Sequence, residues 1–115
     1  MFSDKTKFYF LAESRKRFLT QLINNELVKR FGFGEILFIL DDKNKLYAVE
    51  NKCPHQGLKM KGCKVKDNKI TCPWHQYTFD LQTGRGHGLY LPRFDLEENE
   101  KGFFLKRTYF SWLGE

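Results

Sequence analysis

The sequence lacks the long apolar runs of membrane-spanning or secreted chains. The longest such run, residues 36–40, is five residues long, whereas a membrane-spanning helix needs about 20. Near the start, residues 8–12 are too few for the apolar core of a signal peptide and are flanked by Lys7 and Glu13. We therefore expect a cytoplasmic protein that does not associate with membranes.

Cysteine, histidine and proline are scarce, with three of each. An odd number of cysteines argues against a fold held together only by disulfides. Repeats, low-complexity tracts and linkers are also missing. At 115 residues the chain is too short for a large catalytic domain plus a separate cofactor domain, and we expect a single domain over residues 1–115.

Basic residues never form a block of five, although 20 basic residues outnumber 14 acidic ones. A net charge of +6 permits an anionic partner without selecting one. The densest run, residues 15–17, is typical of a solvated face. Aromatic and lysine residues are interleaved, but the aromatics fall at expected core positions. We therefore expect no nucleic-acid binding.

Strand and turn signals dominate the chain. Aromatic residues make up 17%, including 12 Phe, and they fit a half-buried pleated surface. Residues 15–31 admit either a helix ending near Gly32 or two strands turning at Asn24 and Asn25, and we favour the strands. The fold class is all-β, an antiparallel sandwich or barrel. The expected strands are residues 8–11, 35–40, 46–49, 63–66, 69–71, 76–81 and 103–110.

Four residues stand out as metal ligands, and they form two local pairs. Cys53 and His55 lie in Cys-Pro-His, and Cys72 and His75 lie in Cys-Pro-Trp-His, each between expected strands. Two Cys and two His suit structural zinc. However, zinc fingers commonly place both Cys together and both His together. One Cys and one His from each loop instead suit a [2Fe-2S] cluster in which two His replace two Cys on one iron. The order favours iron–sulfur and leaves zinc as the alternative.

The pattern resembles that of Rieske ferredoxins and Rieske domains, over about residues 33–110. The likeness implies an antiparallel β-sandwich with a small cluster-binding subdomain at about residues 50–92 and one [2Fe-2S] cluster per chain. It further implies that Cys53 and Cys72 ligate the inner iron. His55 and His75 would ligate the outer iron, close to the surface.

The resemblance also bears on the reduction potential. High-potential members brace the two loops with a disulfide, but Leu58 and Trp74 occupy those positions here. Such members also direct Ser and Tyr hydroxyls at the cluster, where this chain has Tyr77 and Phe79. Hydrogen bonds to cluster sulfur stabilise the added electron, so we expect a low potential, about −150 mV. Gln76 stands where the family often has Gly, a difference that would alter packing or solvent access.

The other cysteine, the third histidine and a group of lysines are also candidate functional residues. We interpret Cys63 as a small buried residue and not as a fifth ligand. His87 lies in a glycine-rich stretch, residues 84–92, that corresponds to the loop covering the cluster in the family, and we do not expect it to be a ligand. Lysines near the loops form a solvated surface or, alternatively, a docking surface for an acidic partner: Lys59, Lys61, Lys64, Lys66 and Lys69.

The functional expectation is a soluble Rieske electron-transfer protein and not an enzyme on its own. It would carry one electron between a ferredoxin reductase and a terminal oxidoreductase such as a ring-hydroxylating dioxygenase. The alternatives are a small Rieske subunit of a nitrite-reductase-like complex and a zinc-binding interaction module. A catalytic Rieske oxygenase would need a second iron held by two His and a carboxylate. After His55 and His75, only His87 is left.

Overall fold

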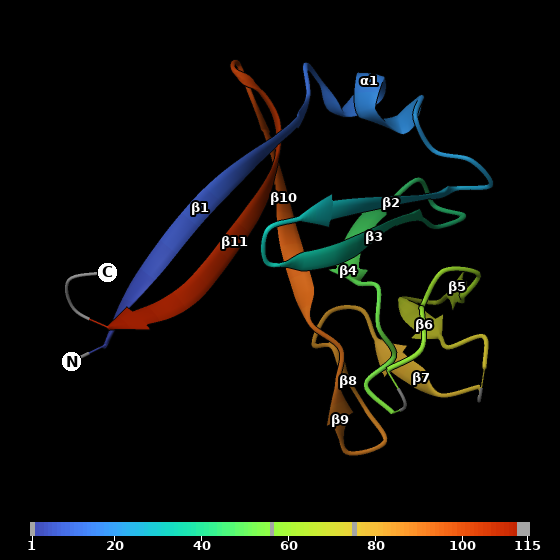
Figure 1. Ribbon diagram of the computed structural model, residues 1–115. Coiled ribbons are helices and arrows are strands. Elements are labelled where there is room, and N and C mark those ends of the chain that lie inside the picture. The colour runs from blue at the N-terminus through green and yellow to red at the C-terminus, as the bar shows by residue number, and fades with distance from the viewer. Residues whose placement is uncertain (1, 56, 75, 113–115) are drawn as a thin grey trace. The chain divides into compact units, whose positions relative to one another are not determined.

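The computed structural model describes residues 2–55, 57–74 and 76–112, with the side chains at positions 2–4 and 109–112 left out of the description. These residues form antiparallel strands with one short helix, which confirms the expected all-β class (Figure 1). The chain divides into two compact units. One contains both ends of the chain, up to Gln21 and from Phe94, and the other is Leu22–Arg93. Among the described residues no helix is long and apolar enough to cross a membrane.

The terminal unit is built on three strands. β1 (Phe2–Ala12) and β10 (Arg93–Asn99) both pair antiparallel with β11 (Gly102–Trp112). The β1–β11 register shifts between Phe10 and Ala12, which marks a β-bulge. Both ends of the chain thus lie in neighbouring strands of one sheet.

A single short helix, α1 (Arg15–Leu19), follows β1. Ser14 caps it, because its hydroxyl accepts the Arg17 N–H at 3.0 Å. The helix buries Phe18 completely, and its ring lies 5.4 Å from that of Phe103 on β11. This packing, between residues distant in sequence, holds α1 on the terminal sheet.

The central unit begins with an antiparallel meander. β2 (Glu26–Phe31), β3 (Gly34–Leu40) and β4 (Leu46–Glu50) pair in chain order. Consecutive residues of β3, 36–39, are all buried, so this strand is covered on both faces. Its continuous apolar run is the reason the strand could be predicted.

A second antiparallel sheet follows in the same unit. β5 (Lys64–Lys66), β6 (Lys69–Thr71) and β7 (Thr78–Asp80) pair in order. Asp67 and Asn68 join β5 to β6 with φ of 53° and 61°, as a type I′ hairpin turn requires.

The last element of the central unit is a small hairpin formed by β8 (Arg85–Gly86) and β9 (Leu89–Tyr90). It lies within the glycine-rich stretch and contacts β7.

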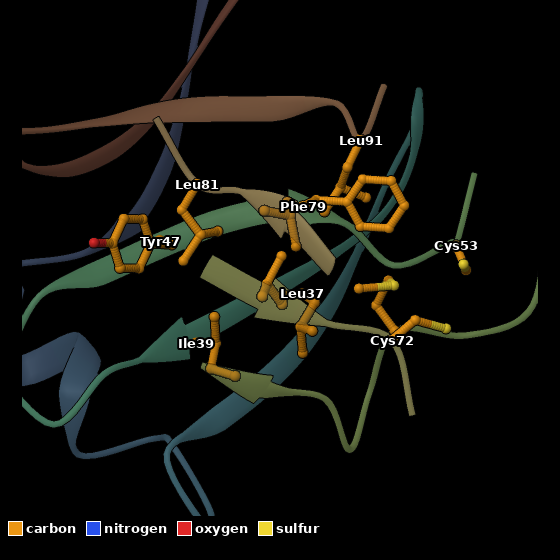
Figure 2. Packing of buried hydrophobic residues seen from close by; sticks show 11 residues of the cluster. Leu37, Ile39, Tyr47, Cys53, Cys72, Phe79, Leu81 and Leu91 are labelled. Carbon is orange, nitrogen blue, oxygen red and sulfur yellow. The ribbon is translucent and has the colours of Figure 1, made fainter. Parts of the chain in front are cut away.

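One buried cluster joins the two larger sheets of the central unit, as a sandwich requires. Figure 2 shows its side chains converging between the strands, with Cys53 and Cys72 at one end. Its members are Leu37, Ile39, Tyr47, Val49, Cys53, Met60, Ile70, Cys72, Phe79, Leu81 and Leu91.

The sequence prediction was wrong in four places. Residues 84–92, expected as a loop, contain the short β8–β9 hairpin. Residues 15–19 form a helix, where strands were favoured, because the Ser14 cap and the burial of Phe18 stabilise a turn of helix. β10 was not predicted, because only Phe94 and Leu96 mark its apolar face and the rest of the strand is charged or polar. β1 runs well beyond the predicted residues 8–11, because β11 pairs with its polar half. Of the two strands favoured within residues 15–31, the second is confirmed as β2, and so is the turn at Asn24 and Asn25 (φ 53° and 65°).

Candidate metal centre

Two of the four predicted ligands are buried thiols at the same end of the central core. Cys53 is 1% exposed and Cys72 is fully buried, and neither forms a disulfide (Figure 2). His55, two residues after Cys53, is exposed. The fourth predicted ligand, His75, lies outside the described residues. The structure therefore brings the two cysteines together and leaves His55 at the surface.

The first ligand loop is closed by two backbone hydrogen bonds around its cysteine. The Cys53 N–H donates to the Leu58 carbonyl at 2.6 Å, and the Cys53 carbonyl accepts the Gly57 N–H at 2.7 Å. Gly57 has φ of +73°, a left-handed conformation that glycine adopts without strain. The loop thus turns back on itself and presents the thiol inward.

The second ligand loop repeats this arrangement at the same spacing. The Cys72 N–H donates to the Tyr77 carbonyl at 2.7 Å, and the Cys72 carbonyl accepts the Gln76 N–H at 3.2 Å. Gln76 occupies the place of Gly57 and also has a left-handed φ, +60°. Two loops distant in sequence therefore hold their cysteines in matched turns, as ligands of one shared group require.

Asn51 ties the returning end of the first loop to β3. Its side chain is buried, and its carbonyl oxygen accepts the N–H groups of Met60 and Lys61, both at 2.9 Å. Its amide donates to Glu35 Oε1 at 2.8 Å, while its backbone N–H donates to the Glu35 carbonyl at 2.9 Å. This one side chain fixes where the loop begins and ends.

Glu35 extends the same network outward to two basic side chains. Its carboxylate contacts Lys59 Nζ at 2.7 Å and Arg30 at 3.3 Å. The hydrogen bonds from Lys59 and then from Asn51 hold the pKa of Glu35 below its ordinary value of 4.5. The network is therefore complete above pH 4.5 and weakens as the pH falls and Glu35 becomes protonated.

Trp74 connects the two ligand loops. Its indole N–H donates to the Lys59 carbonyl at 3.0 Å, while its ring remains 57% exposed. Trp74 occupies one of the two positions that carry the bracing disulfide in high-potential Rieske proteins, according to the resemblance above. A hydrogen bond thus joins the loops where a covalent link is missing.

Three aromatic rings are in contact beside the loops. The His55 and Tyr77 rings are stacked, with centroids 4.1 Å apart and planes 25° apart. The Tyr77 ring also contacts the ring of His87, with centroids 4.7 Å apart and planes 36° apart. Nothing in the sequence pattern indicated this contact, because the three residues come from three separate segments.

The comparison with family models decides the family of this chain. The model of the Rieske [2Fe-2S] domain matches residues 16–95. The chain belongs to the Rieske [2Fe-2S] domain family. Members of this family bind a [2Fe-2S] cluster.

Individual relatives differ in kind. The Rieske chain is 31% identical to cholesterol 7-desaturase of Caenorhabditis elegans over 67% of its length, covering 18% of that protein. It is 35% identical to the ferredoxin component of the naphthalene 1,2-dioxygenase system of Pseudomonas aeruginosa, over 45% of this chain and 50% of the ferredoxin. The chain thus spans half or less of the length of these two curated relatives.

A solved structure confirms the fold. A Mycobacterium tuberculosis chain named for the small subunit of an NADH-dependent nitrite reductase superposes with a TM-score of 0.66. The match covers 91% of this chain and 96% of the other, at 16% identity. At this identity the likeness shows the Rieske fold alone.

The donor set of this Rieske domain fits the cluster. A [2Fe-2S] cluster of this type needs two thiolates and two imidazoles. Cys53 and Cys72 lie in matched turns and form no disulfide, and His55 lies on the same loop as Cys53 and is exposed. The chemistry and placement of the described ligands therefore agree with the family's cofactor.

The third cysteine differs in its environment. The pKa of the Cys63 thiol is raised to about 12. Burial is the main cause, and the negative charge of the nearby Glu26 carboxylate is the second. Its Sγ lies 3.9 Å from Glu26 Oε2. A thiol of this kind stays protonated at neutral pH and is a poor metal ligand or nucleophile. The structure leaves Cys63 half-buried, so it is less buried than expected.

Gln76 provides a test of the matched turns. A left-handed φ strains any residue with a Cβ. Glycine relieves this strain but loses more conformational entropy on folding. We therefore expect Gln76→Gly to raise the free energy of unfolding by about 0.5–1 kcal/mol. Urea unfolding of the cluster-free chain measures this. The control is Gln82→Gly, at an exposed position without a positive φ, which should lose about 0.5–1 kcal/mol. Equal losses in both variants would contradict the strain at Gln76.

Proposed function

We propose that this Rieske domain carries single electrons between a reductase and a terminal oxidoreductase, and that Cys53, His55, Cys72 and His75 hold its [2Fe-2S] cluster. The observation that carries the proposal is the pair of matched loops, with two buried thiols and an exposed His55 imidazole. When bound, the cluster accepts and releases one electron. The turns of Cys53 and Cys72 supply buried thiolates, and His55 offers the surface from which an electron can reach a docked partner.

The same proposal extends to domain organisation and location. The cluster-binding subdomain would span about residues 50–92, within a single Rieske domain over residues 1–115. The two ligand loops, the Asn51 anchor and the β8–β9 hairpin all fall within residues 50–92. The cytoplasmic location and the lack of membrane or nucleic-acid binding stay predictions.

The proposed partners are a ferredoxin reductase and a terminal oxygenase or reductase. Similarity to the ferredoxin component of a dioxygenase system supports an oxygenase as the acceptor. Full-length likeness to a chain named for a nitrite reductase subunit keeps the small-subunit role as a second candidate. Exposed lysines on the β5–β6 hairpin (Lys64, Lys66 and Lys69) would favour an acidic partner surface.

Metal and acid-labile sulfide analysis of anaerobically purified protein tests the proposed cofactor site. We expect two irons and two sulfides per chain, with a visible spectrum that bleaches on addition of dithionite. Electron uptake from a ferredoxin reductase should then bleach the same bands. One zinc per chain without sulfide or colour, after expression with ample iron, would reject electron transfer and leave a zinc-binding module.

The reduction potential gives a sharper prediction. Position 79 is a fully buried Phe, which has no hydroxyl to donate to the cluster or its ligands. With fewer hydrogen bonds to stabilise the added electron, we expect a midpoint near the low end of the Rieske range, about −150 mV. A dye-mediated redox titration followed by absorbance measures it. A midpoint well above zero would contradict the assignment to the low-potential type.

A further inference from the structure

The contacts among the rings of His55, Tyr77 and His87 point to a role that the family assignment does not include. We propose that Tyr77 and His87 are positioning residues, which fix the plane of the His55 imidazole through the His55–Tyr77–His87 stack. The inference rests on the proposed function, because it takes His55 to be a ligand of the cluster.

The stack joins three segments of the central unit. His55 belongs to the first ligand loop, Tyr77 follows the second, and His87 lies in the turn of the β8–β9 hairpin. Centroid distances of 4.1 and 4.7 Å show that Tyr77 contacts both imidazoles. The longer separation is at the short end of the range for favourable aromatic pairs, roughly 4.5–7 Å, and the shorter one is just below it. Contact with the Tyr77 ring therefore limits rotation of the exposed His55 ring.

His87 is itself held in place by β7. Its Nε2 accepts the backbone N–H of Thr78 at 3.1 Å, and its ring meets the edge of Phe79 at 6.3 Å. His87 and Gly88 form the two-residue turn of the hairpin, with φ of 55° and 75°, as in a type I′ turn. The His87 ring is thus anchored to β7, the strand that follows Tyr77.

A glycine allows this hairpin to approach β7. A Cβ added at Gly86 would overlap the carbonyl oxygen of Thr78 and lie 3.1 Å from the Phe79 Cα. Only glycine fits such a backbone approach. Because Gly86 directly precedes His87, the close approach brings the His87 imidazole within hydrogen-bonding distance of the Thr78 N–H.

The expected consequence is a His55 imidazole with one orientation toward the metal in both oxidation states. Loss of the Tyr77 contact would leave the His55 ring with fewer contacts against rotation, and a less firmly held ligand dissociates more readily. An aromatic pair contributes about 0.5–1.5 kcal/mol. That energy corresponds to a roughly two- to twelvefold change in the rate of ligand release, using 0.59 kcal/mol for RT.

The test uses cluster-loaded protein with nitrogen-15-labelled histidine. In the reduced wild-type protein, pulsed EPR measures the nitrogen couplings of the two imidazole ligands. We expect Tyr77→Leu to change one of the two couplings, and to speed cluster loss to an iron chelator roughly two- to twelvefold. Tyr77→Phe keeps the ring and should match the wild type in both measurements. Tyr90→Leu, at an exposed tyrosine of the same hairpin, is the control for a general loss of hairpin stability.

His87→Asn provides a second, milder variant. Asparagine tolerates a left-handed φ and offers a hydrogen-bond acceptor. The substitution removes the His87 imidazole that contacts Tyr77. We expect the same coupling to change in the same direction by less than in Tyr77→Leu. If couplings and loss rates are unchanged in both Tyr77→Leu and His87→Asn while the wild type holds its iron and sulfide, the stack has no positioning role. A wild type without iron and sulfide would instead reject the proposed function.

Discussion

Replacing Cys72 with alanine is expected to remove the cluster entirely, with iron and sulfide falling to background. Cys72 is fully buried, and its turn is matched to that of Cys53. If both thiolates bind one iron, a single remaining thiolate cannot hold it. Cys53→Ala should have the same effect, since the two turns are equivalent.

Cys63→Ala is the matched control for this experiment. Cys63 lies in the same unit, and the raised pKa of its thiol keeps it protonated. Iron and sulfide should stay at the wild-type level, measured by colorimetric analysis on protein purified side by side. If Cys63→Ala loses the cluster while Cys72→Ala keeps it, the ligand assignment is wrong.

Asn51→Leu should destabilise the fold more than any exposed substitution. The change keeps a similar volume but leaves the Met60 and Lys61 N–H groups without their acceptor. It also removes a donor from Glu35. Each unsatisfied buried group costs about 1–3 kcal/mol, so we expect the free energy of unfolding to fall by about 2–5 kcal/mol.

Urea unfolding of Asn51→Leu and of an exposed asparagine variant measures this difference. Asn99→Leu removes a single exposed hydrogen bond, from the Lys101 N–H at 2.8 Å, and should change stability by about 0.5 kcal/mol or less. A loss in Asn51→Leu no greater than in Asn99→Leu would show that the loop is held by other contacts.

The predictable parts of this molecule are those encoded over short distances. Cys53, His55 and Cys72 sit in tripeptide and tetrapeptide motifs, and the Asp67–Asn68 turn is set by residues that adopt positive φ. β3 was predicted because its apolar run is continuous. Local sequence therefore indicated both the ligand loops and the sheets beside them.

The parts that escaped prediction depend on contacts between distant residues. Helix α1 exists because Phe18 packs on Phe103, and β10 because β11 pairs with a strand rich in acidic residues. The His55–Tyr77–His87 stack and the Trp74–Lys59 hydrogen bond likewise join separate segments. Periodicity and spacing carry no signal for such pairs, because each residue is unremarkable within its own segment.

The pairing of β1 with β11 also bears on whether the order of the strands along the chain can be circularly permuted. Phe2 lies opposite Trp112 in the register of these strands, and the two strands run side by side in Figure 1. A short glycine-rich linker from residue 112 to residue 2 would therefore span little distance. New ends opened in the exposed turn between β3 and β4 would leave every described strand intact. Circular permutation is tolerated where the joined residues lie close together, so we expect residues 2–112 to fold in this permuted order.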